Sequence, residues 1–476
     1  MKNIIILLAY LSLLSGCKDF AESLDFTEVI NPNLSESSVV GQPNSAQIWK
    51  AGIEREISRT LNEILILAEL GSDNYANTQT FYSQFLDNLD IRTTDPDIRD
   101  TQNEIARIAK MAEFGLSSVG PGDPEYTQEV EAEYHFYLGL SRLYAAMYFS
   151  ELSQETLGVP QNSSSNYDSA IASFNSAIGI VSKPEYHLAL ARAHYYLGNK
   201  DEAVKAAGDA ITLDSDFIRS ARFDEKEEPS NTMESALYER GTFDDFQPLP
   251  TLDFLDPKYS FLTPDVDPSV HILKAEEAYL ILAEASHANN DLSGMKSNLI
   301  SLFDVIASRE IRIIDDSGET RGDQENAVDD DIRPSGSDDT VNGRSGLVLD
   351  RTSGDVSIPS VSGTSLTADE ISSMEINDKS LELVYQTRQE VFIAEGLRFV
   401  DMGVKLVINE NEILQNDNIK DGDPGTIPVI PTFIDSVKND LDAFTYDKEN
   451  GIATTKININ EILVANKNSE QVLPFH

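Results

Sequence analysis

Hydrophobic residues recur at three- and four-residue spacing along most of the chain, which predicts amphipathic helices. The first stripe starts at Ser45, a residue type suited to a helix N-cap, and continues to Leu65. Further helical patterns lie at 97–118, 127–150, 166–181, 184–197, 200–213, 271–289, 292–309, 379–399 and 432–443. No stretch shows a convincing strand pattern. The sequence therefore predicts a mainly α-helical protein.

Part of this pattern is a repeat, at about 127–310. Small and aromatic residues fall where a tetratricopeptide helix pair needs them, at Leu190, Ala191, His194, Gly198, Ala203, Ala207 and Ala210. A degenerate copy precedes this pair, at Tyr134, Leu138, Gly139, Ala170, Phe174 and Ala177, and another helix pair begins with Ala278–Ala285. Such repeats bury their apolar faces against their neighbours, so we expect a continuous helical stack.

One long segment, at about 315–369, interrupts the helices and is rich in Asp, Ser, Gly and Thr. A loop of this length in a compact domain is usually functional or disordered, and both interpretations stay open. We expect residues 44–476 to form a single helical domain that contains this insert.

The N-terminus has the pattern of a lipoprotein signal peptide at residues 1–16. Lys2 precedes an apolar run from Ile4 to Leu14, and Leu14-Ser15-Gly16 leads to Cys17, the one cysteine of the chain. Cleavage before Cys17 would allow a diacylglyceryl thioether and an N-acyl chain such as palmitate to anchor the protein to a membrane. Residues 17–43 would then form a polar tether. The alternative is an ordinary secretory peptide with a chance cysteine.

The composition is strongly acidic, with 81 Asp and Glu against 36 Lys and Arg and a formal charge of −45. This excess repels nucleic-acid phosphates, so we expect no nucleic-acid partner. We interpret the acidity as a solvated surface that keeps an exported protein soluble. A single cysteine also excludes an intramolecular disulfide.

The motifs of common enzymes are missing. The six histidines form no HExxH motif, and the chain has no phosphate-binding glycine loop or dinucleotide fingerprint. One calcium-loop candidate fails, because Ile419 occupies a ligand position and Pro428 replaces the closing Glu. We therefore predict no catalytic residues, no metal site, and no cofactor apart from the lipid on Cys17.

Several motifs in a fixed order resemble the SusD/RagB family of nutrient-binding lipoproteins. They are the cysteine of the signal peptide, Asn31-Pro32-Asn33, Glu69-Leu70-Gly71-Ser72-Asp73, Gly158-Val159-Pro160, Ala278–Ala285 and the late helical segment from Arg388 to Gly403. The resemblance covers nearly all of the chain after Cys17. It implies a right-handed tetratricopeptide-like stack with an irregular, loop-rich ligand face.

The resemblance also implies a function. The protein would be a non-catalytic lipoprotein of the outer membrane, facing the exterior. It would capture an oligosaccharide, or alternatively a peptide, and deliver it to a SusC-like TonB-dependent transporter. The alternative is a scaffolding or assembly lipoprotein whose tetratricopeptide surface binds other proteins.

Aromatic residues after the first helix are the candidates for ligand contact. Trp49 lies on the apolar stripe of that helix, so we interpret it as a core residue. A sugar platform would instead use Tyr and Phe, with amides to bind hydroxyl groups, at Asn74, Tyr75, Asn77, Phe81 and Tyr82. The alternative is ordinary packing of this loop on the helices.

Charged residues of the late helical segment have a second interpretation. Arg388, Glu390, Glu395 and Arg398 are spaced to pair along a helix or with neighbouring helix ends. Because charged residues in packed helices are seldom buried without partners, we assign them to structural ion pairing and not to ligand contact.

Overall fold

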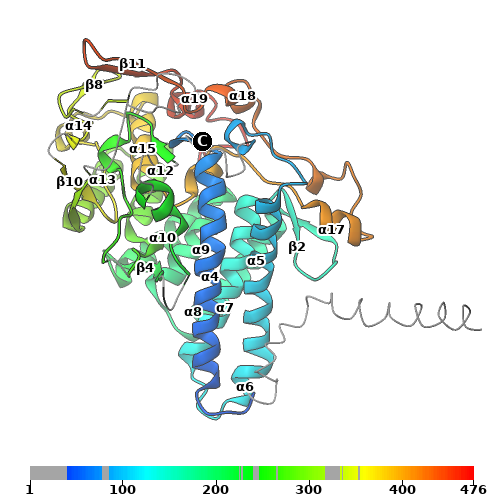
Figure 1. Ribbon diagram of the computed structural model, residues 1–476. Helices are drawn as coiled ribbons and strands as arrows, with labels where there is room; N and C mark the ends of the chain where they lie inside the picture. Colours follow the sequence, from blue (N-terminus) through cyan, green and yellow to red (C-terminus); the bar gives the residue numbers. More distant parts are fainter. Residues whose placement is uncertain are drawn as a thin grey trace, which may run out of the picture.

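The computed structural model describes residues 40–77, 85–224, 226, 229–239, 246–263, 266–316, 333–334, 336–351 and 354–476. The fold is mainly α-helical, as the sequence predicts (Figure 1). Three long helices stand side by side: α4 (Ser45–Leu70), α5 (Pro96–Phe114) and α7 (Gln128–Tyr148). The predicted signal peptide, Cys17 and most of the tether lie outside the described residues. No helix of the described part is both long enough and apolar enough to cross a membrane.

A residue far away in sequence, Asp123, stabilises the start of α4. Its N-cap is Asn44, not the predicted Ser45, and Asn44 makes no side-chain cap hydrogen bond. Instead, the Asp123 carboxylate accepts hydrogen bonds from the backbone N–H groups of Asn44 (3.1 Å) and Ala46 (2.8 Å). Trp49 is a packing residue, as predicted, because its indole N–H donates to the Met111 carbonyl and its ring contacts Phe114.

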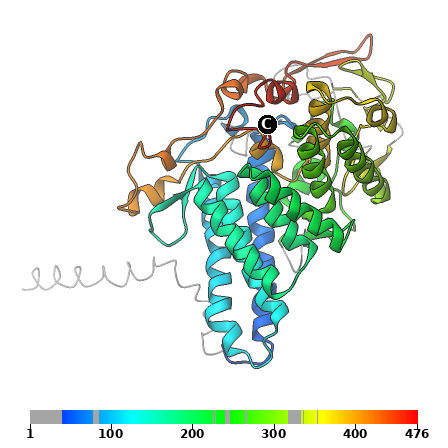
Figure 2. The same cartoon turned by 180° about the vertical axis from the view of Figure 1, so that it is seen from behind.

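The predicted repeats form consecutive helix pairs. Helix α7 pairs with α8 (Ser163–Ile180), α9 (Pro184–Tyr196) with α10 (Lys200–Leu213), and α12 (Ala275–Ala288) with α13 (Leu292–Ser308). These pairs stack beside one another, as Figure 2 shows from behind. Ala203, Ala207 and Ala210 are fully buried on α10, where small side chains let the helices approach closely.

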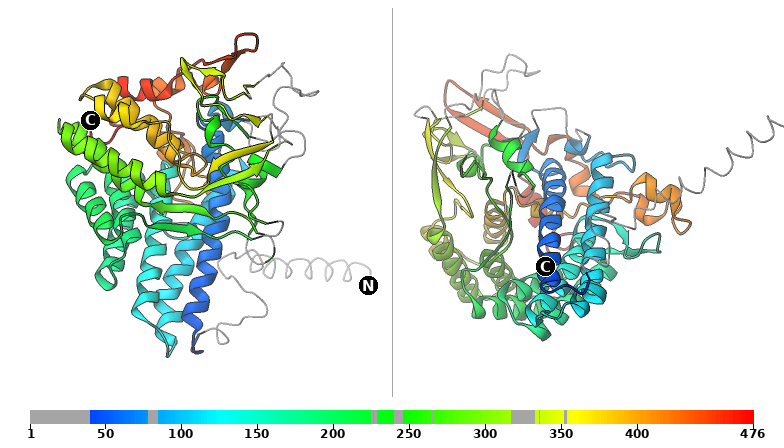
Figure 3. Two further views of the ribbon diagram at one scale, coloured as in Figure 1. Left: turned by 90° about the vertical axis from the view of Figure 1, so that its left-hand side faces the viewer. Right: turned by 60° about the horizontal axis from the view of Figure 1, so that its bottom comes forward.

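Short strands, which the sequence did not reveal, form small sheets around the helical stack (Figure 3). The predicted helix at 271–289 starts late, because β6 (Val270–Lys274) pairs antiparallel with β4 (Ile218–Ala221). The insert at 315–369 is partly β-structured: β7 (Ile311–Asp315) pairs with β10 (Asp355–Pro359), and β8 (Thr340–Val341) lies between β9 (Arg344–Ser345) and β12 (Ile452–Thr455). Residues 317–332, 335 and 352–353 of the insert lie outside the described residues.

The two last predicted helices are shorter than expected. Helix α15 (Asp378–Val391) ends before a turn in which Ala394 and Gly396 have positive φ angles, and α16 (Leu397–Asp401) follows. In place of a helix at 432–443, the chain forms α18 (Thr432–Asp435) and the turn Lys438–Asp440.

The remaining helices and turns are Leu86–Asn88, Gly115–Val119, Gly120–Gly122, Thr232–Glu234, Ser235–Glu239, Asp253–Leu255, α14 (Ala368–Ser373), α17 (Glu410–Gln415), Pro424–Thr426 and α19 (Ile459–Ala465). The remaining strands are β1 (Tyr75–Asn77), β2 (Glu151–Ser153), β3 (Pro160–Asn162), β5 (Phe246–Pro248) and β11 (Phe444–Asp447).

Candidate functional site

The first two ligand candidates, Asn74 and Tyr75, are interior residues. Asn74 donates its amide hydrogen to Glu69 Oε2 (2.7 Å) and accepts one from Gln389 Nε2 (3.0 Å). Burial raises the pKa of Glu69 to about 7, and the Asn74 amide partly offsets this rise. The Tyr75 ring stacks on Phe246, and its side chain is buried. With exposures of 0% and 1%, both residues support the packing interpretation of this segment.

The other three candidates stay predictions. Asn77 is half-buried at the end of β1, opposite Phe246 in the pairing with β5. Phe81 and Tyr82 lie outside the described residues. Next to that gap, Phe85 is 45% exposed, and the Arg92 guanidinium carbon lies 3.5 Å from the centre of its ring.

Three of the four late charged residues form the predicted structural ion pairs. Arg388 pairs with Asp401 (2.8 Å), Arg398 with Asp73 (2.5 Å), and Glu395 with both Lys258 (2.5 Å) and Lys274 (2.6 Å). Glu390 instead accepts hydrogen bonds, from Thr364, Ser365 and Gln386. Most of these partners come from distant segments, so the charges join separate parts of the fold and do not stabilise one helix.

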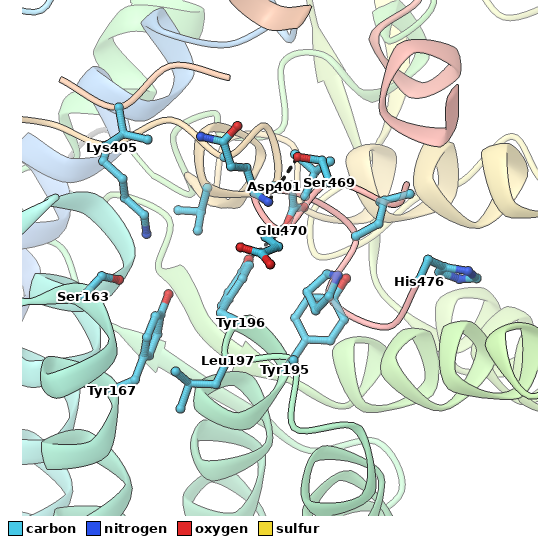
Figure 4. Close-up of a pocket in the computed structure, with 18 of the residues that line it drawn as sticks. Ser163, Tyr167, Tyr195, Tyr196, Leu197, Asp401, Lys405, Ser469, Glu470 and His476 are labelled. Carbon is cyan, nitrogen blue, oxygen red and sulfur yellow. Dashed lines mark hydrogen bonds between the residues drawn. The ribbon is translucent and has the colours of Figure 1, made fainter. Parts of the chain in front are cut away.

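A cavity of about 460 Å³ lies where several separate segments meet. Most of its wall comes from the start of α8, the end of α9, the region from α16 to Lys405, and the C-terminal segment after α19, and Tyr385 of α15 and Val429 complete it (Figure 4). The C-terminal segment is held in place by Phe475, whose ring contacts Tyr195 edge to face at 5.0 Å. A cavity of this size matches the volume of small-molecule sites in proteins.

Two of the tyrosines that line this cavity are Tyr196, which is half-buried, and Tyr167, which is 3% exposed. Tyr167 from α8 and Tyr196 from α9 are stacked, with ring centroids 6.3 Å apart and an angle of 22° between the planes. Their rings come from adjacent helices, so the packing of the stack places them together. Aromatic faces of this kind bind the apolar C–H faces of sugars.

Hydrogen bonds fix the polar part of the cavity wall that Tyr196 and Asp401 form. Tyr196 donates its hydroxyl hydrogen to Asp401 Oδ1 (2.9 Å) and accepts one from Arg388 Nη2 (3.0 Å). Arg388 Nε donates to the other Asp401 oxygen (2.8 Å). Because both partners of the Tyr196 hydroxyl are ion-paired to each other, the ring is held in one orientation.

Lys405 adds an ammonium group to the cavity wall. Its ammonium group donates to the carbonyls of Ala146 (2.8 Å) and Met147 (2.7 Å) at the end of α7, and it lies 5.8 Å from the centre of the Tyr167 ring. Burial lowers the pKa of Lys405 to about 7. Figure 4 shows its side chain extending toward Ser163 and Tyr167.

The cavity combines aromatic faces with a few fixed polar groups, an arrangement that can hold a small polar ring and orient it. The sequence did not predict this site. Its residues are far apart along the chain, and the closest signal was Gly198, which marks the turn after α9 as part of a repeat. Among the described residues, no group of three or more His, Cys, Asp or Glu side chains is placed to hold a metal ion.

Comparison with known proteins places the fold. A scan of protein-family models and a search of curated proteins found no match. Solved structures do match. A SusD-like protein from Bacteroides fragilis has a TM-score of 0.54 at 13% identity, over 81% of this chain and 98% of its own. A SusD superfamily protein from Bacteroides vulgatus has a TM-score of 0.51 at 11% identity, over 79% and 98%. A candidate sugar-binding protein from Bacteroides vulgatus has a TM-score of 0.53 at 13% identity, over 81% and 98%.

Proposed function

Because the chain has the SusD-like fold, we propose that the protein is a non-catalytic carbohydrate-binding lipoprotein of the outer membrane. Anchored through Cys17 and facing the exterior, it captures an oligosaccharide and delivers it to a SusC-like TonB-dependent transporter. The fold, the sugar-binding description of one structural neighbour and the lipoprotein pattern at residues 1–17 support this proposal.

The observation that carries the binding function is the cavity lined by Tyr167, Tyr196 and Lys405. Stacked aromatic rings, a fixed carboxylate and an ammonium group present both the apolar and the hydrogen-bonding surfaces that a sugar ring requires. A reaction would need a nucleophile with its base, or paired carboxylates at a set separation. Of the two carboxylates that line this cavity, Asp401 is bound to Arg388 and Tyr196, and Glu470 is exposed on the C-terminal segment.

Filling the cavity should weaken this binding. Leu197 is half-buried at the cavity wall, and Leu197→Trp would place an indole in the space of a sugar. We expect the affinity for the best-binding oligosaccharide to fall by about tenfold or more, because the indole occupies space that the ligand needs. Isothermal titration calorimetry would measure this, after a screen of malto-, cello-, manno- and galacturono-oligosaccharides and of short peptides.

Leu213→Trp is the matched control, because Leu213 ends α10 with 48% of its surface exposed and does not line the cavity. Its binding should equal that of the unmodified protein. Unchanged binding in Leu197→Trp would place the ligand site elsewhere, and binding of peptides alone would change the proposed cargo.

The delivery step requires a membrane partner. Affinity purification of the anchored protein from detergent-solubilised outer membranes should recover a large TonB-dependent barrel in a stoichiometric amount. A Cys17→Ser variant, which cannot be lipidated, should be absent from that membrane fraction. Recovery of assembly factors without a barrel would favour the scaffolding alternative.

A further inference from the structure

Lys405 differs in its partners from the ion-paired cations in the interior of the fold. The buried Arg192, Arg388 and Arg398 each pair with a carboxylate, as do the buried Lys258 and Lys274. Within the described part of the chain, Lys405 has no carboxylate at ion-pair distance, and its hydrogen bonds go to two backbone carbonyls. Arg312 likewise donates to two backbone carbonyls, but Arg312 does not line the cavity, whereas Lys405 does.

The geometry leaves this cation one free donor. An ammonium group has three N–H bonds, and Ala146 and Met147 accept two of them. The third is available to the cavity that Lys405 lines together with Ser163 and Tyr167. The Ser163 hydroxyl already donates to the Ala146 carbonyl, so it offers its lone pairs and not a negative charge.

The other charged groups of the cavity do not neutralise Lys405. Asp401, on α16, is bound to Arg388 and Tyr196. Glu470 and His476 lie on the C-terminal segment, where Glu470 is exposed to solvent. Burial and the neighbouring His287 lower the pKa of His476 to about 4, so His476 is neutral near pH 7. Below pH 7, where Lys405 is mainly protonated, a ligand that enters beside it therefore meets one uncompensated positive charge.

We infer that the cavity binds a sugar that carries a carboxylate, a uronic acid residue, with one carboxylate oxygen accepting the third hydrogen bond of Lys405. The sugar ring then lies against Tyr196, next to Tyr167. This inference rests on the proposed carbohydrate-binding function and specifies the class of sugar. A charge-assisted hydrogen bond of this kind changes affinity by about tenfold or more.

A methyl ester provides the sharpest test. Trigalacturonic acid and its fully methyl-esterified form share one sugar backbone and differ in charge. We expect the unmodified protein to bind the acid at least about tenfold more tightly than the ester at pH 6, measured by isothermal titration calorimetry. Lys405→Gln keeps an N–H donor for the α7 carbonyls but loses the charge, so it should bind both forms equally, whereas Lys405→Arg should retain the preference.

The pH dependence gives a second measurement that needs no variant. The sugar carboxyl is ionised from pH 6 to 9, whereas Lys405 loses its proton as the pH rises past its pKa of about 7. Affinity for the acid should therefore fall between pH 6 and pH 9, and affinity for the ester should not.

Two outcomes would overturn the inference alone: equal binding of acid and ester by the unmodified protein, or an acid preference that Lys405→Gln retains. In those cases, binding of neutral oligosaccharides that Leu197→Trp weakens would leave the proposed function intact. If no carbohydrate of either kind binds, both the proposed function and this inference fail.

Discussion

Replacing Glu395 by glutamine should lower the free energy of unfolding by about 3–5 kcal/mol, because two buried cations would lose their one shared carboxylate. Glu395 Oε1 lies 2.5 Å from Lys258 Nζ and 2.6 Å from Lys274 Nζ, and all three side chains are at most 3% exposed. Lys258 also donates to one backbone carbonyl and Lys274 to two, but a carbonyl carries no full charge to balance an ammonium group.

The loss should depend on pH. Burial lowers the pKa of Lys274 to about 8, although the Glu395 carboxylate acts to raise it. Between pH 8 and the usual lysine value, the unfolded chain therefore binds more protons than the folded one, so this group favours folding more as the pH rises. Removing Glu395 lowers the Lys274 pKa further and extends this range below pH 8. The Glu395→Gln variant should consequently lose more stability at pH 7 than at pH 9.

Urea unfolding followed by circular dichroism would measure both effects. Asp209→Asn is the control: Asp209 pairs with Lys205 on the surface of α10, with side-chain exposures of 43% and 78%. An exposed pair of this kind contributes less than about 1 kcal/mol. A Glu395→Gln loss as small as that of the control would mean that the buried lysines find other compensation.

The helices were predictable from sequence because their signals are local. Apolar spacing within one segment located α4, α7 and the pairs of the stack, and small residues located the close helix contacts. Strand β6 was misread because Val270–Lys274 is equally apolar in either conformation, and its pairing with β4 is a contact between distant segments. The turn at 392–396 was missed because Glu69, more than 300 residues away, stabilises it by accepting a hydrogen bond from the Gly396 N–H.

The site, too, was predictable where the signal is local and unpredictable where it depends on contacts between distant segments. Arg388, Glu395 and Arg398 were identified as structural charges, because the residue types and their helical setting suffice for that. Their partners could not be identified, since Asp73 and Lys258 lie far away in sequence. Asn74 looked like a loop residue available to a ligand, but Gln389 from α15 covers it. Similarly, no local motif marks Lys405. Its hydrogen bonds go to carbonyls of α7, which lie far away in sequence.

Gly139 and Gly179 should respond in opposite ways to replacement by alanine. Gly139 lies on α7 and faces the fully buried Phe174 side chain of α8. A Cβ added at Gly139 would lie 2.6 Å from Phe174 Cδ1. Gly179 lies on α8, is exposed, and would place the Cβ in open space. Alanine favours a helix over glycine by about 1 kcal/mol at either position, so the difference between the two variants reports the contact between α7 and α8.

We expect Gly139→Ala to lower the free energy of unfolding by about 1–3 kcal/mol, because the Phe174 ring is enclosed and the overlap must be relieved by moving a helix. Gly179→Ala should raise it by about 0.5–1 kcal/mol. Urea unfolding of the two variants in parallel tests both signs. If both variants gained stability, α7 and α8 would have room to separate, and Gly139 would not be needed for their close approach. A loss confined to Gly139→Ala would show that this small residue of the repeat sets the distance between the helices, and α8 also carries Ser163 and Tyr167 of the cavity wall.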